Sequence, residues 1–279
     1  MSKATDRVRL KPDTTAALKR GPTAALKRGP TAALKRGTTA ALERDATASF
    51  TARERRLIQQ LRTPLDVQRF LNRLPYNNEP HGRATLRSFR GVVRYGCAHC
   101  LEAAMFAATV LEQRRYPPLV LSFESTDELD HVIFVYRART GWGSVARSRD
   151  PGLHGRRPVF ATPRALALSY ADPYIDFTGR LRGYAVVDLR GMGDYNWRTA
   201  ETNVWKVERM LLEFPHRPIA TSDRRVDWMR ARYRAFRAAY PGRKPVGYAG
   251  RERWTELPAE FNPSRNLAWV SLRARRGPA

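Results

Sequence analysis

The sequence predicts an α+β protein in which one apolar helix packs against an antiparallel sheet. Two observations support this fold class. An alanine- and leucine-rich segment over residues 98–114 has the length and composition of a buried helix, and Pro117-Pro118 ends it. Short apolar runs follow it at hairpin spacing, as expected for strands that pair with their neighbours in the chain.

Globular sequence begins near Phe50 and opens with two expected helices. Residues 51–62 form the first. Thr63 and Pro64 provide an N-cap and a first-turn proline for the second. The apolar positions of that second helix recur at helical spacing: Leu65, Phe70, Leu71 and Leu74. Residues 75–96 are polar and irregular, so we expect a loop region there.

The remaining elements follow in order along the chain. We expect strands at residues 119–123, 132–136, 142–147 and 184–189, with a tight turn at Thr140-Gly141. We expect helices at residues 163–170, 203–214 and 223–240, because their apolar residues recur at helical spacing.

Three regions of different character divide the chain. Residues 1–49 carry an octapeptide repeat, TAALKRGP or TAALKRGT, that starts at Thr15, Thr23 and Thr31, with a decayed copy, TAALERDA, at Thr39. Each copy has one leucine, and the first three end in a Gly-Pro or Gly-Thr break, so we expect a disordered basic arm. The arm is either a contact for an anionic surface or an expanded tract without function. Residues 50–200 form the expected α+β domain, and residues 201–279 a helical extension.

The net charge of +25 suggests an anionic partner such as a nucleic acid, but its distribution weakens that interpretation. Residues 1–50 contribute +7, and the other +18 is spread over 229 residues. Only two lysines follow residue 50, namely Lys206 and Lys244. Arginine in place of lysine is also what a GC-rich genome produces.

The sequence also indicates where in the cell the protein is located. No apolar run is long enough to span a membrane, and the N-terminal residues lack the apolar core of a secretory signal. Two cysteines in 279 residues do not suggest a disulfide scaffold. We therefore expect a cytoplasmic protein with reduced thiols and no membrane partner.

Three residues suggest nucleophilic catalysis by a thiol. Cys100 opens the apolar helix, His131 opens a strand, and Asp150 follows the next strand. A catalytic thiolate needs the positive end of a helix, an imidazole to exchange its proton, and a polar group to orient that imidazole. The main-chain amides at the start of a helix can also stabilise an oxyanion.

Cys97 and Cys100 also form a C-x-x-C pair, which leaves two alternatives open. A thioredoxin-like redox site would need an apolar strand before the motif, but the preceding residues 87–96 are rich in arginine. A zinc site would need further ligands from the histidines, and none of these forms a second close pair. The favoured interpretation requires no metal or cofactor, and Cys97 has a structural or incidental role in it.

The chain resembles a known family around the apolar helix. The most specific motif is His99-Cys100-Leu101-Glu102-Ala103-Ala104. Further similar segments are Leu74-Pro75-Tyr76-Asn77, Asp130-His131-Val132, Gly141-Trp142-Gly143 and Pro158-Val159-Phe160, and the likeness ends near Leu189-Arg190. These residues resemble the bacterial transglutaminase-like superfamily of papain-type cysteine enzymes, in an uncharacterised branch. The likeness covers less than half of the chain.

The resemblance implies a transglutaminase/papain-like fold and a Cys100-His131-Asp150 triad. Asp150 lies later after Trp142 than the family pattern places its aspartate, and Ser148 is nearer to the strand end. Tyr76, Asn77 and Asn78 occupy the region where papain-type enzymes supply an extra oxyanion donor, although a polar loop has the same composition. Trp142 is either a wall of the acyl pocket or a core residue.

The expected function is thiol-dependent acyl transfer, or hydrolysis of an amide or peptide bond, through a thioester. The expected partner is then a protein or peptide amide substrate. An incomplete triad would instead leave a catalytically inactive binding module. The third possibility is a basic nucleic-acid-binding protein.

Overall fold

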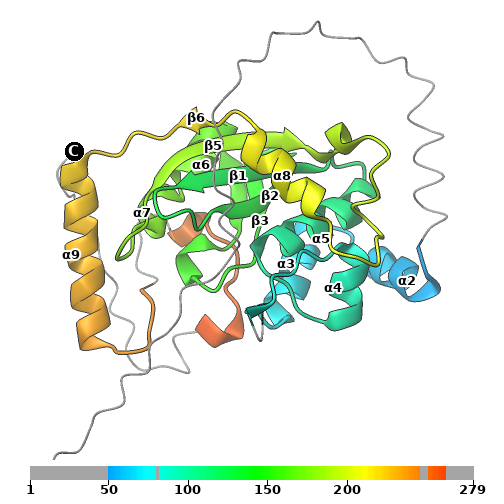
Figure 1. The fold of residues 1–279 in the computed structure, drawn as a ribbon, viewed down its shortest axis with the longest axis horizontal. Helices are drawn as coiled ribbons and strands as arrows, with labels where there is room; N and C mark the ends of the chain where they lie inside the picture. Colours follow the sequence, from blue (N-terminus) through cyan, green and yellow to red (C-terminus); the bar gives the residue numbers. More distant parts are fainter. Residues whose placement is uncertain (1–49, 80–81, 246–250, 262–279) are drawn as a thin grey trace, which may run out of the picture.

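The computed structural model describes residues 50–79, 82–245 and 251–261, so the octapeptide repeats lie outside the described residues. Its centre is a six-stranded sheet with the order β4-β3-β2-β1-β5-β6, and every neighbouring pair is antiparallel (Figure 1). The strands are β1 (Leu119–Ser125), β2 (His131–Ala138), β3 (Gly141–Val145), β4 (Arg156–Phe160), β5 (Leu181–Asp188) and β6 (Arg217–Pro218). The predicted α+β class with an antiparallel sheet is confirmed.

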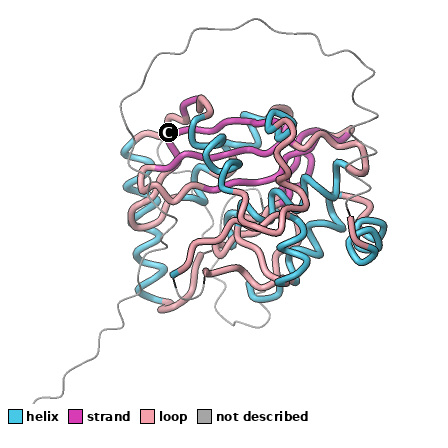
Figure 2. The backbone as a smooth tube through the Cα atoms, turned by 45° about the vertical axis from the view of Figure 1, so that its right-hand side comes forward, coloured by secondary structure: helices cyan, strands magenta, loops and turns pink. Residues whose placement is uncertain are grey.

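Helices cover both faces of this sheet. They are α2 (Ala52–Gln60), α3 (Pro64–Arg73), α4 (Phe89–Tyr95), α5 (Cys100–Glu112), α6 (Pro163–Leu168), α7 (Ala171–Tyr174), α8 (Trp205–Glu213) and α9 (Asp223–Ala239). One apolar core joins α3, α4, α5 and α8 to the sheet, and a second joins α6 and α7 to its opposite face. The arrangement is three layers, with helices on either side of the strands (Figure 2).

The two N-terminal helices begin where the sequence predicts. Thr51 and Thr63 are their N-caps, and each forms a capping box with the acidic residue three positions later. Pro64 occupies the first turn of α3, where its missing N–H costs no helical hydrogen bond.

Helix α5 is buried along nearly its whole length. Residues 101–111 are all buried, and the helix packs against α3 and α4 on one side and against β2 on the other. Such a helix needs apolar residues on every face, which explains its alanine-rich composition. Its N-terminus is held by a short parallel bridge between Tyr76 and Ala98.

The register of β1 and β2 places His131 at one end of the sheet. Phe123 pairs with His131, and Val120 pairs with Phe134. The two rings of the first pair stack, with their centroids 6.1 Å apart and an interplanar angle of 6°. The strand therefore begins with a histidine whose ring is fixed against the core.

Four elements were not predicted. Helix α4 lies inside the segment expected to be irregular, and the short helix α7 and the edge strands β4 and β6 had no clear sequence signal. Strand β6 pairs with β5, and Val207 and Leu211 of α8 enter the main core, so residues beyond 200 belong to the same sheet and core as the domain. Helix α9 packs through a separate small cluster of Ile175, Val226 and Met229. Within the described residues, no helix is both long and apolar enough to cross a bilayer.

Candidate active site

The start of α5 and the start of β2 meet at a cavity of about 220 Å³. Cys100, His99 and His131 line this cavity together with Tyr76 and Asp150. The structure thus brings the predicted nucleophile, imidazole and carboxylate to one hollow, although their individual contacts differ from the predicted triad.

The His131 ring is fixed by a main-chain carbonyl. The side chain is buried, and Nε2 lies 3.1 Å from the carbonyl oxygen of Leu153. A carbonyl oxygen only accepts hydrogen bonds, so Nε2 carries the proton and donates it. Nδ1 is then the ring nitrogen that exchanges a proton with a thiol.

The Cys100 thiol is strongly acidic. Burial opposes its ionisation, but hydrogen bonds from the side chains of His131 and His99, and the positive charge that these rings carry, hold its pKa well below the ordinary value. Its position at the first residue of α5 adds the positive end of the helix dipole. The arrangement favours a thiolate paired with an imidazolium.

His99 is a second imidazole beside the thiol. Its Nε2 lies 2.9 Å from the carbonyl oxygen of Thr85 and 3.7 Å from Oε1 of Glu102. Burial would lower its pKa, but the hydrogen bond with Cys100 and the charge of Glu102 raise it to about 9. His99 therefore stays positively charged at neutral pH and stabilises the thiolate.

Glu102 holds the loop before α5 against the helix. Its carboxylate is fully buried and accepts hydrogen bonds from Asn77 Nδ2 at 3.0 Å and from the main-chain N–H groups of His99 at 3.0 Å and Arg87 at 2.9 Å. Thr85 Oγ1 donates at 3.2 Å. The sequence marks Glu102 only as part of a motif. Its bond to the His99 N–H has the spacing of a capping box, but Asn77, Thr85 and Arg87 lie too far along the chain to be inferred from spacing.

Asp150 does not contact His131, which corrects its predicted role as the orienting group. Its carboxylate lies 2.6 Å from Lys244 Nζ and 3.8 Å from Arg149 Nε. The alternative, Ser148, accepts a hydrogen bond at its Oγ from the main chain of Asp150 at 3.0 Å. Lys244, on the segment after α9, pairs with the carboxylate of Asp150. The main-chain oxygen of Leu153 orients the His131 ring instead.

We expect Asp150→Asn to change the alkylation rate of Cys100 by iodoacetamide at pH 7 by less than about threefold, because the lost ion pair is partly exposed. An aspartate that orients a catalytic histidine behaves differently, since its replacement by asparagine in a serine protease triad lowers the catalytic turnover by about 10⁴-fold. A loss of that order in Asp150→Asn would restore Asp150 to the triad.

Asn77 is not available as an oxyanion donor, contrary to expectation. Both of its amide protons are engaged, with Thr85 Oγ1 at 2.8 Å and Glu102 Oε2 at 3.0 Å. Asn78 lines the cavity but is exposed, and its nearest acceptor is the carbonyl of Tyr76 at 3.5 Å.

Tyr76 is the better placed polar group. Burial, together with the negative charges of Cys100 and Asp150, raises its pKa well above the ordinary value, against a hydrogen bond from the main chain of Cys100. The phenol therefore stays protonated and can donate a hydrogen bond beside the thiol. The sequence marked its loop, but not which residue of the loop faces the thiol.

Trp142 belongs to the sheet rather than to the cavity. It lies on β3, pairs with Phe160 of β4, and packs half-buried against the second core. It is absent from the residues that line the cavity, so the structure supports the core interpretation of Trp142.

Cys97 has a different environment from Cys100. Its sulfur accepts a hydrogen bond from Arg87 Nη1 at 3.0 Å, and both cysteines are free thiols. In the part of the chain that the structure describes, no three His, Cys, Asp or Glu side chains gather in a group that could hold a metal ion.

Comparisons with known proteins add little to this geometry. No family model and no curated protein matches the chain. Among solved structures, the chain is similar to Legionella pneumophila LapG (EGTA-treated), with 13% identity and a TM-score of 0.30, over 57% of this chain and 92% of that one. A TM-score at this level does not establish a common fold.

Proposed function

We propose that this protein is a cysteine-dependent enzyme that cleaves or transfers an acyl group through a thioester on Cys100. The observation that supports this most directly is the acidic thiol at the first residue of α5, with His131 and His99 beside it in a cavity. A buried structural thiol has no need of two imidazoles, and burial alone would raise its pKa.

The reaction follows from these positions. The Cys100 thiolate attacks the substrate carbonyl carbon, so a C–S bond forms and the carbonyl electrons move to oxygen. The His131 imidazolium gives its proton to the amide nitrogen as the C–N bond breaks, and the amine leaves. Water, or a second amine for transfer, then attacks the thioester while His131 takes up its proton, and the C–S bond breaks.

The developing oxyanion needs hydrogen-bond donors near Cys100. The groups suited to this role are the main-chain N–H groups in the first turn of α5, which have no acceptor within the helix, and the protonated phenol of Tyr76, which lies against the Cys100 N–H. His99 stays charged beside the thiolate and keeps it ionised before the attack.

The sequence resemblance supports the same chemistry. The motif from His99 to Ala104 covers the nucleophile, the second imidazole and the buried Glu102. In a transglutaminase-like or papain-like enzyme, a cysteine at a helix start works with a histidine from the neighbouring sheet. The present site has that order, with the carbonyl of Leu153 in the position of the third member.

We expect the full-length protein to react with p-nitrophenyl acetate in a burst equal to the protein concentration, because the thiolate forms an acetyl thioester. Mass spectrometry of the digested protein should place the acetyl group on Cys100. Cys100→Ala should lose the burst, and the matched variant Cys97→Ala should keep it. A burst that persists in Cys100→Ala would contradict the proposal.

Because Asp150 pairs with Lys244 and not with His131, one alternative stays in view, namely a binding module without turnover. In that case the wild-type protein would give no burst, while its cavity would still bind a ligand.

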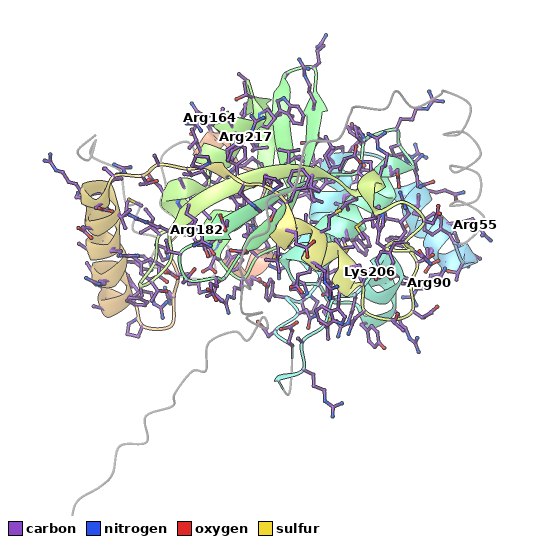
Figure 3. All side chains as sticks on the ribbon, turned by 45° about the horizontal axis from the view of Figure 1, so that its top comes forward. Arg55, Arg90, Arg164, Arg182, Lys206 and Arg217 are labelled. Carbon is purple, nitrogen blue, oxygen red and sulfur yellow. The ribbon has the colours of Figure 1, made fainter. Side chains whose placement is uncertain are left out.

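The nucleic-acid alternative remains a prediction. Figure 3 shows six labelled basic side chains that come from six different elements: Arg55, Arg90, Arg164, Arg182, Lys206 and Arg217. Nucleic-acid affinity that does not fall as salt rises would contradict it.

A further inference from the structure

The cavity beside Cys100 carries the opposite charge to the protein. The chain has a net charge of +25, but acidic side chains outnumber basic ones around the cavity. Six of the acidic residues form no ion pair among the described residues: Glu79, Asp127, Glu128, Asp130, Asp176 and Glu208. We call them the acidic rim.

The basic residues of the cavity are too few to neutralise this rim. Lys244 and Arg149 both pair with Asp150, which is not one of the six. Arg182 pairs with Glu124 at 2.8 Å. These three cations share two carboxylates, Asp150 and Glu124, so they leave one positive charge against the six carboxylates of the rim.

The hydrogen bonds of the rim come from neutral donors. Asp127 accepts from the hydroxyls of Ser125 and Thr178, and Asp130 accepts from the main-chain N–H of Ser125. Such bonds fix the carboxylates in place without cancelling their charge.

Glu208 interacts electrostatically with both His99 and Cys100. It is half-buried on α8 and lines the cavity. Burial raises its pKa, His99 opposes this rise, and the negative charges of Glu79 and Cys100 add to it. A carboxylate whose ionisation is opposed by burial and by neighbouring negative charges gains from a cation placed beside it.

We infer that the cavity takes an acyl substrate that carries positive charge, namely a peptide segment with a lysine or arginine side chain beside the carbonyl that Cys100 attacks. The reaction itself rests on the proposed function, whereas the charge preference rests on the acidic rim. Net charge alone would predict the reverse, because a chain of +25 repels cationic peptides and attracts anionic ones.

The test measures binding in the full-length Cys100→Ala protein, so that turnover cannot interfere. The probe is the capped peptide acetyl-Gly-Lys-Gln-Gly-Arg-Gly-amide, and its comparison peptide has glutamate in place of lysine and arginine. Calorimetric titration at low salt should show binding of the cationic peptide at least about tenfold tighter, and its affinity should fall as salt rises.

Glu208→Gln in the same Cys100→Ala background should lower the affinity for the cationic peptide by about threefold or more, which is the effect of losing one partly screened charge pair. The matched control is Glu213→Gln, the same change on the exposed side of the same helix and outside the cavity, and it should leave the affinity unchanged. Equal binding of the two peptides, or tighter binding of the acidic one, would overturn the inference.

The outcomes of the binding test and the acylation test are independent of each other. A charge preference without a p-nitrophenyl acetate burst would remove the proposed reaction and keep the cationic ligand. A burst on Cys100 without any charge preference would keep the reaction and remove the cationic ligand.

Discussion

Replacing Glu102 with alanine is expected to lower the free energy of unfolding by about 3–5 kcal/mol, the usual cost of removing one member of a buried charged network. The change removes a fully buried carboxylate, leaves the main-chain N–H groups of His99 and Arg87 without their acceptor, and removes one of the two acceptors of Asn77 Nδ2. Urea unfolding followed by circular dichroism measures this loss.

Glu213→Ala is the matched control for this variant. Glu213 is exposed at the end of α8, and its removal should change the free energy of unfolding by no more than about 0.5 kcal/mol. Equal losses in the two variants would show that Glu102 does not anchor the loop before α5.

The second large effect is expected for His131→Ala. The Cys100 thiolate loses a charge-assisted hydrogen bond of about 1.5–3 kcal/mol, which corresponds to a factor of about ten to one hundred in the thiolate population. The pKa of the thiol rises as a result, although His99 remains beside it. The alkylation rate of Cys100 at pH 6 should fall by up to this factor, and it falls by the full factor where the pH is below the pKa of the wild-type thiol.

Asp130→Asn is the matched control for His131→Ala. Asp130 is the adjacent residue and lines the same cavity, but it bonds the main chain of Ser125 rather than the thiol. It should leave the alkylation rate close to that of the wild type, so a similar loss in both variants would assign the effect to disturbed folding.

The elements that the sequence predicted are those whose signals are local. The N-caps at Thr51 and Thr63 and the stop at Pro117-Pro118 depend on neighbouring residues, and the apolar composition of α5 is complete within the helix itself. Local signals of this kind survive in the folded chain because tertiary packing agrees with them.

Strand β4 was missed because its residues suggest an exposed loop. Pro158 cannot donate to a sheet ladder, and it is tolerated because β4 is an edge strand. Arg156 is fully buried between the rings of Tyr170 and Trp254, at 4.1 Å and 4.2 Å. Trp254 lies almost one hundred residues later, so no local pattern could indicate this cation–π sandwich.

The candidate site was predictable in part for the same reason. Cys100 and His131 begin regular elements, and the meeting of a helix start with a strand start follows from their order. The partner of His131 is a main-chain oxygen of Leu153, and every residue type has such an oxygen, so sequence cannot single it out. Asp150 has the expected residue type, but Lys244 on a distant segment determines its contact.

The most direct test of a thiolate assembled by His131 is the pH dependence of alkylation by iodoacetamide, with mass spectrometry to separate Cys100 from Cys97. A depressed pKa means that the thiolate persists as the pH falls below the ordinary thiol range. We expect wild-type Cys100 to react at a rate that stays high through neutral pH and falls only under acidic conditions, and we expect His131→Ala to shift this curve to higher pH. A wild-type curve centred near the ordinary thiol value of about 8.5, unmoved by His131→Ala, would contradict the proposed site.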